Sequence, residues 1–202
     1  MLILRSSPPS PFGRKVKIAA AVLGLSDRIK IEITDTNDPA DSIRRQNPLG
    51  KIPTLILEDG FVLFDSPVIL EYLDAMAGGG KIIPREGRAR WEVLRLHALT
   101  DGIMDAALLQ VYEKRFRPEE LQLAKWTDYQ AEKVTRGLDE LEAAPPALIS
   151  PTPHIGQIGL ACALGYLDLR FEGKWRDRYP RLVKWLEDFA AQTPSFAATK
   201  AH

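Results

Sequence analysis

Residues 47–70 read NPLGKIPTLILEDGFVLFDSPVIL, and this stretch decides the fold. Two short apolar runs, Thr54–Leu57 and Phe61–Leu63, flank the sequence Glu58-Asp59-Gly60. An Asp-Gly pair between apolar runs is a strong signal for a β-hairpin. Asp65-Ser66-Pro67 follows at once and predicts the start of a helix, since Ser caps helices and Pro is tolerated in their first turn. The stretch therefore predicts a hairpin that leads directly into a helix.

Four elements are predicted before this stretch. Their apolar patterns indicate a strand at 2–4, a helix at 11–25, a strand at 29–33 and a short helix at 38–46. Helices between the first strands imply parallel neighbours, and the closing hairpin adds an antiparallel edge. With the helix that begins at Ser66, these elements predict a compact α/β domain over residues 1–78.

The remainder of the chain predicts helices alone. Three consecutive glycines, Gly78-Gly79-Gly80, and a polar stretch mark the boundary. Helical spacing covers residues 87–114, 118–143, 155–170 and 179–191. The third of these segments is apolar on all sides, which is typical of a buried helix. We expect a second, all-helical domain over residues 86–202.

Composition excludes several classes of function. Lys+Arg and Asp+Glu are both 27, so no net charge attracts nucleic acid or an anionic membrane. Cys162 is the single cysteine, which excludes an intramolecular disulfide and a Cys-rich metal site. The N-terminus lacks a signal-peptide pattern, and no apolar run approaches the roughly 20 residues of a membrane span. We expect a soluble, cytoplasmic protein without nucleic-acid or membrane partners.

The first chemical motif is Ser10-Pro11, at the predicted start of the first helix. Its structural interpretation is an ordinary helix cap. Its functional interpretation uses the same geometry, because a helix N-terminus favours an anion and a hydroxyl there lowers the pKa of a bound thiol. Ser10 has no adjacent base and is a poor nucleophile itself, so it would activate a thiol brought by a ligand. Ser6 and Ser7 compete for this role.

Two further loops supply groups for binding a peptide. A cis Ile52–Pro53 bond would leave the Ile52 N–H and C=O facing solvent, ready to pair with an extended peptide, and Lys51 would neutralise a carboxylate. Asp65-Ser66 is interpreted either as a structural cap or as a site where Ser66 binds a carboxylate and Asp65 an ammonium group. Together these groups suit a small peptide with an amino-acid end, a central thiol and a carboxylate tail, which is the layout of glutathione.

With these motifs at this spacing, the chain resembles the cytosolic glutathione S-transferase superfamily over nearly its whole length. The segments Asn-Pro-Leu-Gly-Lys-Ile-Pro and Asp-Ser-Pro-Val-Ile-Leu-Glu-Tyr-Leu carry the resemblance, which is closest to small bacterial members with a Ser/Cys-Pro-Phe start. The resemblance implies a thioredoxin-like N-terminal domain, an all-helical C-terminal domain that forms the electrophile pocket, and a homodimer. It assigns Ser10 to thiol activation, Lys51 to the glycyl carboxylate, Ile52 and Pro53 to the cis-proline loop, and Asp65 and Ser66 to the γ-glutamyl group.

The implied activity is a glutathione transferase without a metal, in which glutathione is the co-substrate and attacks a small hydrophobic electrophile in detoxification. Two alternatives stay open. One is another reaction of glutathione, such as peroxide reduction or dehalogenation. The other is a non-catalytic regulatory or interaction protein that keeps the fold.

Other polar and aromatic residues receive mostly structural interpretations. The three histidines, His97, His154 and His202, lack metal-ligand spacing, and Cys162 is expected to be a packed small residue. Asp101 and Asp105 are interpreted as a solvated helix face, with a buried polar role or a pocket role as the alternative. Tyr112, Phe116 and Trp126 line the pocket or belong to the core. By the resemblance, His154 is a poorer cap for the buried helix than the usual Ser or Thr, although Gln157 can complete a capping box.

Overall fold

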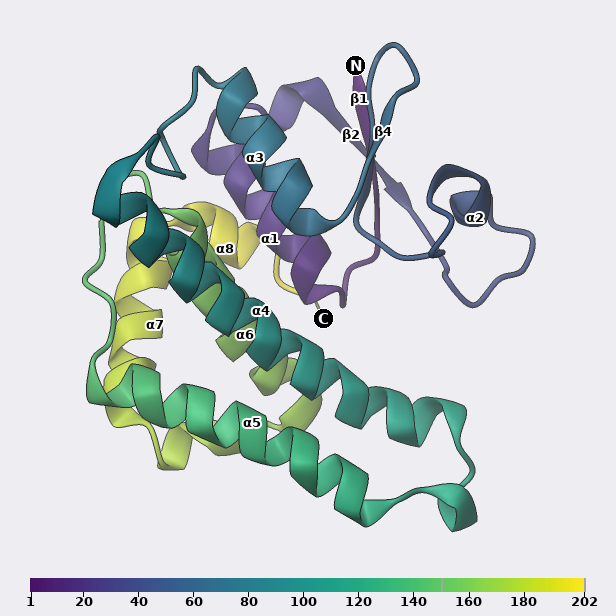
Figure 1. Cartoon of the computed structure of the whole chain (residues 1–202), viewed down its shortest axis with the longest axis vertical. Helices are drawn as coiled ribbons and strands as arrows, with labels where there is room; N and C mark the ends of the chain where they lie inside the picture. Colours follow the sequence, from purple (N-terminus) through teal and green to yellow (C-terminus); the bar gives the residue numbers. More distant parts are fainter. Residues whose placement is uncertain (150, 202) are drawn as a thin grey trace.

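The computed structural model describes residues 1–149 and 151–201. The first part of the chain forms a four-stranded sheet with three helices, in the predicted order of elements (Figure 1). These elements are β1 (Leu2–Ser6), α1 (Pro11–Val22), β2 (Ile29–Ile33), α2 (Ile43–Gln46), β3 (Thr54–Ile56), β4 (Val62–Leu63) and α3 (Ser66–Met76), with a 3-10 turn at Ser26–Arg28.

The strand order of the sheet is β2-β1-β3-β4. β1 pairs with β2 in parallel, and it pairs with β3 antiparallel, so that Leu4 lies opposite both Ile31 and Leu55. The predicted hairpin joins β3 to β4 and turns at Gly60, whose φ of +85° favours glycine. Leu4 and Leu55 are fully buried in a core shared with α1 and α3, which lie side by side (Figure 1).

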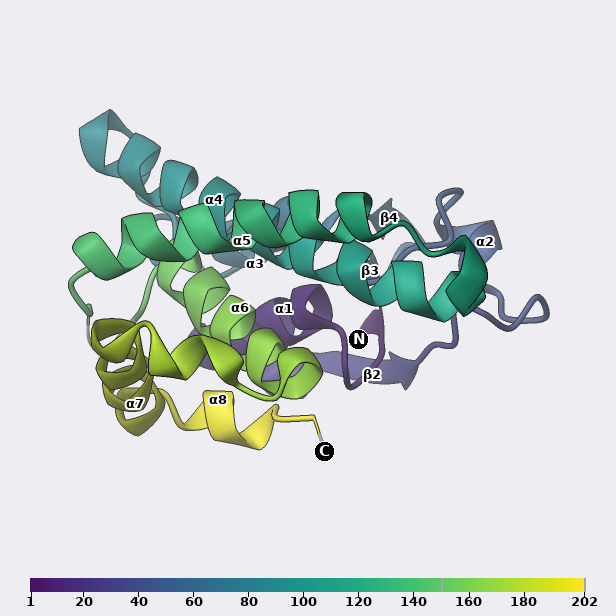
Figure 2. The same ribbon diagram turned by 90° about the horizontal axis from the view of Figure 1, so that it is seen from below.

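The second part of the chain is helical, as predicted. It consists of α4 (Gly87–Phe116), α5 (Ala124–Ala143), α6 (Ile155–Phe171), α7 (Pro180–Gln192) and α8 (Pro194–Ala198), with 3-10 turns at Glu119–Leu121 and Lys174–Asp177. α6 packs against α4 and also against α1, and therefore joins the two parts (Figure 2). No helix among the described residues is both long and apolar enough to cross a membrane.

Several helix boundaries differ from the prediction: α1 ends at Val22 and not at residue 25, and α2 begins at Ile43 and not at residue 38. The second long helix was expected from residue 118, but α5 begins at Ala124 after the 3-10 turn. The buried Glu113 carboxylate accepts a hydrogen bond from the Leu123 amide at 2.9 Å, a tertiary contact that sets this start. α8 was not predicted, because a helix of five residues is too short to show apolar periodicity.

His154 is a better cap than expected. Its Nδ1 accepts a hydrogen bond from the Gln157 amide at 3.2 Å, and the Gln157 Oε1 accepts one from the His154 amide at 3.0 Å. These reciprocal bonds complete a capping box at the start of α6. Burial lowers the pKa of His154 to about 4, so its imidazole stays neutral and keeps the Nδ1 lone pair that the cap requires.

Candidate functional site

Ser10 caps α1, and its hydroxyl group can still donate a hydrogen bond. The backbone of Ser10 is extended, and its Oγ accepts a hydrogen bond from the Gly13 amide at 3.1 Å. A hydroxyl that accepts through its oxygen can still donate its own proton. The structural and functional interpretations of Ser10 are therefore compatible with one another.

The three candidate serines occupy different environments. Ser10 and Ser7 line one cavity, whereas Ser6 is fully buried behind α1 and does not. A side chain at position 13 would place its Cβ 2.2 Å from the Ser6 Oγ, so glycine there permits α1 to begin close against the end of β1. Ser6 is therefore not placed to meet a ligand, and Ser7 remains the alternative to Ser10.

The loop before β3 leaves one peptide unit unpaired. The Ile52–Pro53 bond is cis, as predicted, and neither the amide nor the carbonyl of Ile52 bonds to another described residue. Asn47 braces the loop, because its Nδ2 donates to the Lys51 carbonyl at 2.9 Å and to the Thr54 Oγ1 at 3.2 Å. Sequence reasoning missed this role of Asn47, although an asparagine directly before a loop with two prolines, Pro48 and Pro53, was a visible signal.

The start of α3 confirms the predicted cap and alters one detail of the predicted site. The Asp65 carboxylate accepts a hydrogen bond from the Ser66 amide, so that amide is already engaged. Asp65 is exposed and lines the cavity, whereas Ser66 is fully buried and does not line it. The Ser66 Oγ nevertheless has no hydrogen-bond partner among the described residues, and a buried hydroxyl in that state calls for one.

One cavity of about 510 Å³ unites these groups with the helical part. Ser10, Lys51, Ile52 and Asp65 line one side. The other side comes from α4 and α6, and its lining includes Asp105, Leu108, Tyr112, Arg115, Tyr166 and Arg170. Of the three aromatic candidates, only Tyr112 lines the cavity. Phe116 packs edge-on against Tyr112 at 5.1 Å and is otherwise exposed, and Trp126 lies outside the cavity.

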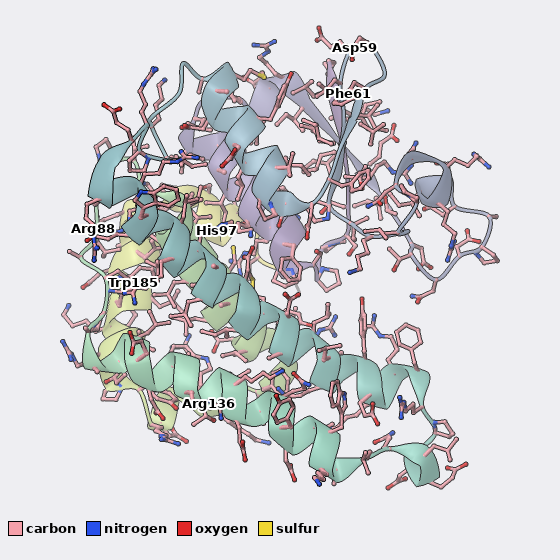
Figure 3. The ribbon with its side chains drawn as sticks, in the orientation of Figure 1. Asp59, Phe61, Arg88, His97, Arg136 and Trp185 are labelled. Carbon is pink, nitrogen blue, oxygen red and sulfur yellow. The ribbon has the colours of Figure 1, made fainter. Side chains whose placement is uncertain are left out.

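A buried charged cluster fastens α1 to α4 beside this cavity. The Lys15 Nζ is fully buried and lies 2.8 Å from the His97 Nε2 and 2.5 Å from the Asp101 Oδ1. His97 lies on the face of α4 that is turned towards α1 (Figure 3). Burial and the Lys15 charge lower the pKa of His97 to about 3, so the neutral imidazole accepts a hydrogen bond from the Lys15 ammonium.

The expectation of a solvated face is therefore wrong for Asp101. Its carboxylate is mostly buried and binds Lys15, a partner far away in the sequence that helical spacing does not reveal. Asp105 is exposed as a whole residue, but it lines the cavity. Partial desolvation of its carboxyl group raises the pKa of Asp105, and the Asp65 charge raises it further, whereas the charges of Lys51 and Lys15 lower it.

The described residues offer no other reactive centre here. They contain no group of three His, Cys, Asp or Glu side chains arranged to hold a metal ion, and His202 lies outside them. Cys162 is fully buried in α6, and burial raises the pKa of its thiol to about 11, so the reactive thiolate is suppressed.

Comparison with known proteins places this geometry in context. The family model "Glutathione S-transferase, N-terminal domain" matches residues 9–76, and "Glutathione S-transferase, C-terminal domain" matches residues 103–188. The chain is 36% identical over 200 residues to the GST-like protein YibF of Escherichia coli strain K12, covering 98% of this chain and 97% of that protein.

Solved structures agree with the fold. A glutathione transferase family member from Pseudomonas fluorescens Pf-5, solved with bound glutathione, is 41% identical, covers 100% of both chains and superposes with a TM-score of 0.93. A second structure of that family member, with bound S-(propanoic acid)-glutathione, gives a TM-score of 0.89 at the same identity and coverage.

Proposed function

Because this chain belongs to the glutathione S-transferase family, we propose that it is a glutathione transferase, which binds glutathione as co-substrate and activates its thiol. One observation carries the proposal. The unpaired Ile52 peptide unit and the helix start at Ser10 line the same cavity. A peptide whose cysteinyl backbone pairs with Ile52 would therefore place its thiol beside the start of α1.

The binding half of the proposal assigns one group to each part of glutathione. The Ile52 N–H and C=O pair with the cysteinyl unit in the manner of an added antiparallel strand. Lys51 attracts the glycyl carboxylate, and the Asp65 carboxylate attracts the γ-glutamyl ammonium. Ser66, at the start of α3, is assigned to the γ-glutamyl carboxylate, although its unpaired hydroxyl is buried and does not line the cavity.

The catalytic half of the proposal rests on Ser10. Its hydroxyl donates a hydrogen bond to the sulfur, and the N-terminus of α1 favours the negative charge, so both lower the thiol pKa. The thiol proton passes to solvent, and the thiolate forms a bond to an electrophile held between α4 and α6. The bound glutathione and the bound thioether in the Pseudomonas fluorescens family member support this scheme.

The test compares Ser10→Ala with Ser7→Ala. We expect wild-type protein to bind glutathione in calorimetry and to lower its thiol pKa, measured by the ultraviolet absorbance of the thiolate. Losing a hydrogen bond to a charged group predicts that Ser10→Ala raises this pKa by about one unit and lowers kcat/KM about tenfold or more. If Ser7→Ala has these effects instead, the activating role belongs to Ser7.

The same preparation separates the alternatives. A panel of aryl halides, hydroperoxides and haloalkanes distinguishes transfer from peroxide reduction and dehalogenation. Binding of glutathione without turnover of any member would favour a regulatory or interaction protein. Absence of binding at millimolar glutathione would contradict the proposal as a whole.

We expect the enzyme to act as a homodimer in the cytoplasm. Phe61 at the hairpin tip and Trp91 on α4 are 62% and 66% exposed (Figure 3 labels Phe61). A groove of about 970 Å³ between α4 and α5, lined in part by Leu96 and Arg136, is available for contact with a second copy. Sedimentation of wild type and Phe61→Ser tests this, with a shift towards monomer expected for the variant.

A further inference from the structure

The helical half of the cleft carries two arginines close to aromatic rings. Arg115, near the end of α4, has its Cζ 5.4 Å from the centre of the Tyr112 ring. Arg170, near the end of α6, has its Cζ 6.0 Å from the centre of the Tyr166 ring. All four residues line the cavity that also contains Ser10. The α4 and α6 side of the cavity, where we expect the second substrate to bind, is therefore cationic as well as aromatic.

Neither guanidinium has an anionic partner among the described residues. No ion pair joins Arg115 or Arg170 to a carboxylate there, and the buried Nε of Arg170 has no hydrogen-bond acceptor. A buried donor without a partner carries a desolvation penalty that a ligand can relieve. The unsatisfied Nε thus points to a missing acceptor.

The buried and half-buried arginines outside the cleft are paired within the protein. Arg14 and Arg176 line a second cavity of about 520 Å³ on the other side of the start of α1. Arg14 donates to the Phe196 carbonyl at 2.6 Å, and Arg176 binds the Asp168 carboxylate at 2.6 Å and 2.8 Å. Arg5 likewise binds Asp41 at 2.7 Å. Among the buried and half-buried arginines of the described residues, only Arg170 has a buried donor without an acceptor, whereas Arg115 is exposed and unpaired, as are Arg28 and Arg45 outside the cleft.

The glutathione half of the cleft, formed by Ser10, Lys51, Ile52 and Asp65, contributes the Asp65 carboxylate, and α4 of the helical half contributes Asp105. The pKa of Asp105 is influenced by Asp65, Lys51 and Lys15. Neither Asp65 nor Asp105 lies within ion-pair distance of a cleft arginine in the described structure. The two arginines are therefore left for the second substrate.

We propose that the electrophile carries a carboxylate, which Arg170 and Arg115 bind while the rings of Tyr112 and Tyr166 and the side chain of Leu108 contact its apolar part. Arginine suits this role because its planar donors match a carboxylate in a bidentate arrangement. The inference rests on the proposed function and replaces the purely hydrophobic electrophile expected from the sequence. With 4-chloro-3-nitrobenzoate, the glutathione thiolate forms a carbon–sulfur bond at the ring, chloride leaves with the bonding pair, and the thiol proton goes to solvent.

The test uses two ligands that differ only in charge. S-carboxymethylglutathione and S-carbamoylmethylglutathione are titrated into the full-length protein by calorimetry, with glutathione as the reference. A charge-assisted hydrogen bond predicts that the carboxylate binds about tenfold more tightly than the amide in wild type. Arg170→Gln and the double variant with Arg115→Gln should bring the two affinities close to one another, while glutathione itself binds as before.

Lys114→Gln provides the matched control. Lys114 neighbours Arg115 on α4 and is exposed, but it does not line the cavity. The Lys114→Gln variant should still bind the carboxylate thioether more tightly than the amide thioether. Kinetics with 4-chloro-3-nitrobenzoate and its carboxamide, each divided by the uncatalysed rate, should show the same preference and the same loss in the arginine variants.

The outcomes separate this inference from the proposed function. If glutathione binds but the carboxylate and amide thioethers bind equally, the inference is overturned and the proposed function stands. The inference is also overturned if the arginine variants weaken glutathione itself as much as the carboxylate thioether, because the guanidiniums would then serve the tripeptide. If neither the thioethers nor glutathione bind, the result contradicts the proposed function itself.

Discussion

The two halves of the cleft are built from different kinds of chemical group. The glutathione half presents a bare peptide unit at Ile52 and two capped helix starts, at Ser10 and Asp65. The helical half presents only side chains, which α4 and α6 bring to one wall. Backbone groups are positioned by local turns and caps, whereas the side chains of the other wall are positioned by how two long helices cross.

This difference predicts which single substitutions should have large effects on stability or binding. In the glutathione half, removing one side chain leaves the peptide unit and the helix start in place. In the helical half, and at the contact between the halves, a single buried side chain determines the geometry. The following predictions, ordered from the largest expected effect to the smallest, test that contrast.

Lys15→Met should cause the largest loss. It removes a buried cation from between Asp101 and His97 and leaves the Asp101 carboxylate without its partner. Breaking a buried ion pair predicts that the free energy of unfolding falls by about 3 kcal/mol in urea denaturation. Lys17→Met on the same helix is the control, since Lys17 is partly buried and forms no ion pair in the described structure. Equal losses in the two variants would show that the cluster does not fasten α1 to α4.

Two helical glycines should respond in opposite directions. At Gly159 a Cβ would come within 2.4 Å of the Thr100 Oγ1, where α6 crosses α4, whereas at Gly102 it would meet no atom within 4 Å. Overpacking predicts that Gly159→Ala lowers the free energy of unfolding by about 2 kcal/mol. Helix propensity predicts that Gly102→Ala raises it by about 0.5 kcal/mol. Thermal unfolding checks both, and a stable Gly159→Ala protein would mean that the helix crossing is loose.

Acidification should weaken the contact between the halves. The pKa of His97 is about 3 in the folded protein against 6.5 in the unfolded chain, so between these values the unfolded chain binds more protons. Stability therefore falls as the pH drops below 6.5. His154 acts in the same direction, and Asp101 opposes it because burial raises the pKa of its carboxyl.

The variant His97→Gln isolates this contribution. Its unfolding free energy should fall by about 2 kcal/mol less than that of wild type between neutral pH and about pH 5. Urea denaturation at a series of pH values measures the difference. Parallel pH profiles for the two proteins would contradict the assignment of the acid sensitivity to His97.

Lys51→Met should have the smallest effect. Lys51 is exposed, and an exposed charge contributes little in water, so the Kd for glutathione should rise only about threefold. The dependence of that Kd on salt should also become weaker. Lys81→Met, outside this cavity, is the control. A much larger loss would mean that side-chain charge and not the backbone dominates the glutathione half.

Much of the first half of the molecule could be predicted from the sequence, because its signals are local. Asp59-Gly60 predicted the hairpin and Ser10-Pro11 the start of α1, whereas the cis bond before Pro53 was implied by the family resemblance. The contact of Asp101 with Lys15 could not be predicted in this way, because its partners lie on different helices. The start of α5 depended on the contact of the Leu123 amide with Glu113, whereas the bracing role of Asn47 is local and was missed.

The amino-acid sequence by itself determined the order of elements, the two-part fold and the turns and helix starts that the proposed glutathione site uses, since glycine, proline and capping residues restrict the backbone where they stand. Only the tertiary structure decided that Ser6 is buried away from the cavity, that Lys15 joins α1 to α4, and that Arg115 and Arg170 face the cleft without partners. Such contacts depend on how helices pack, and packing brings together residues whose separation along the chain carries no local signal.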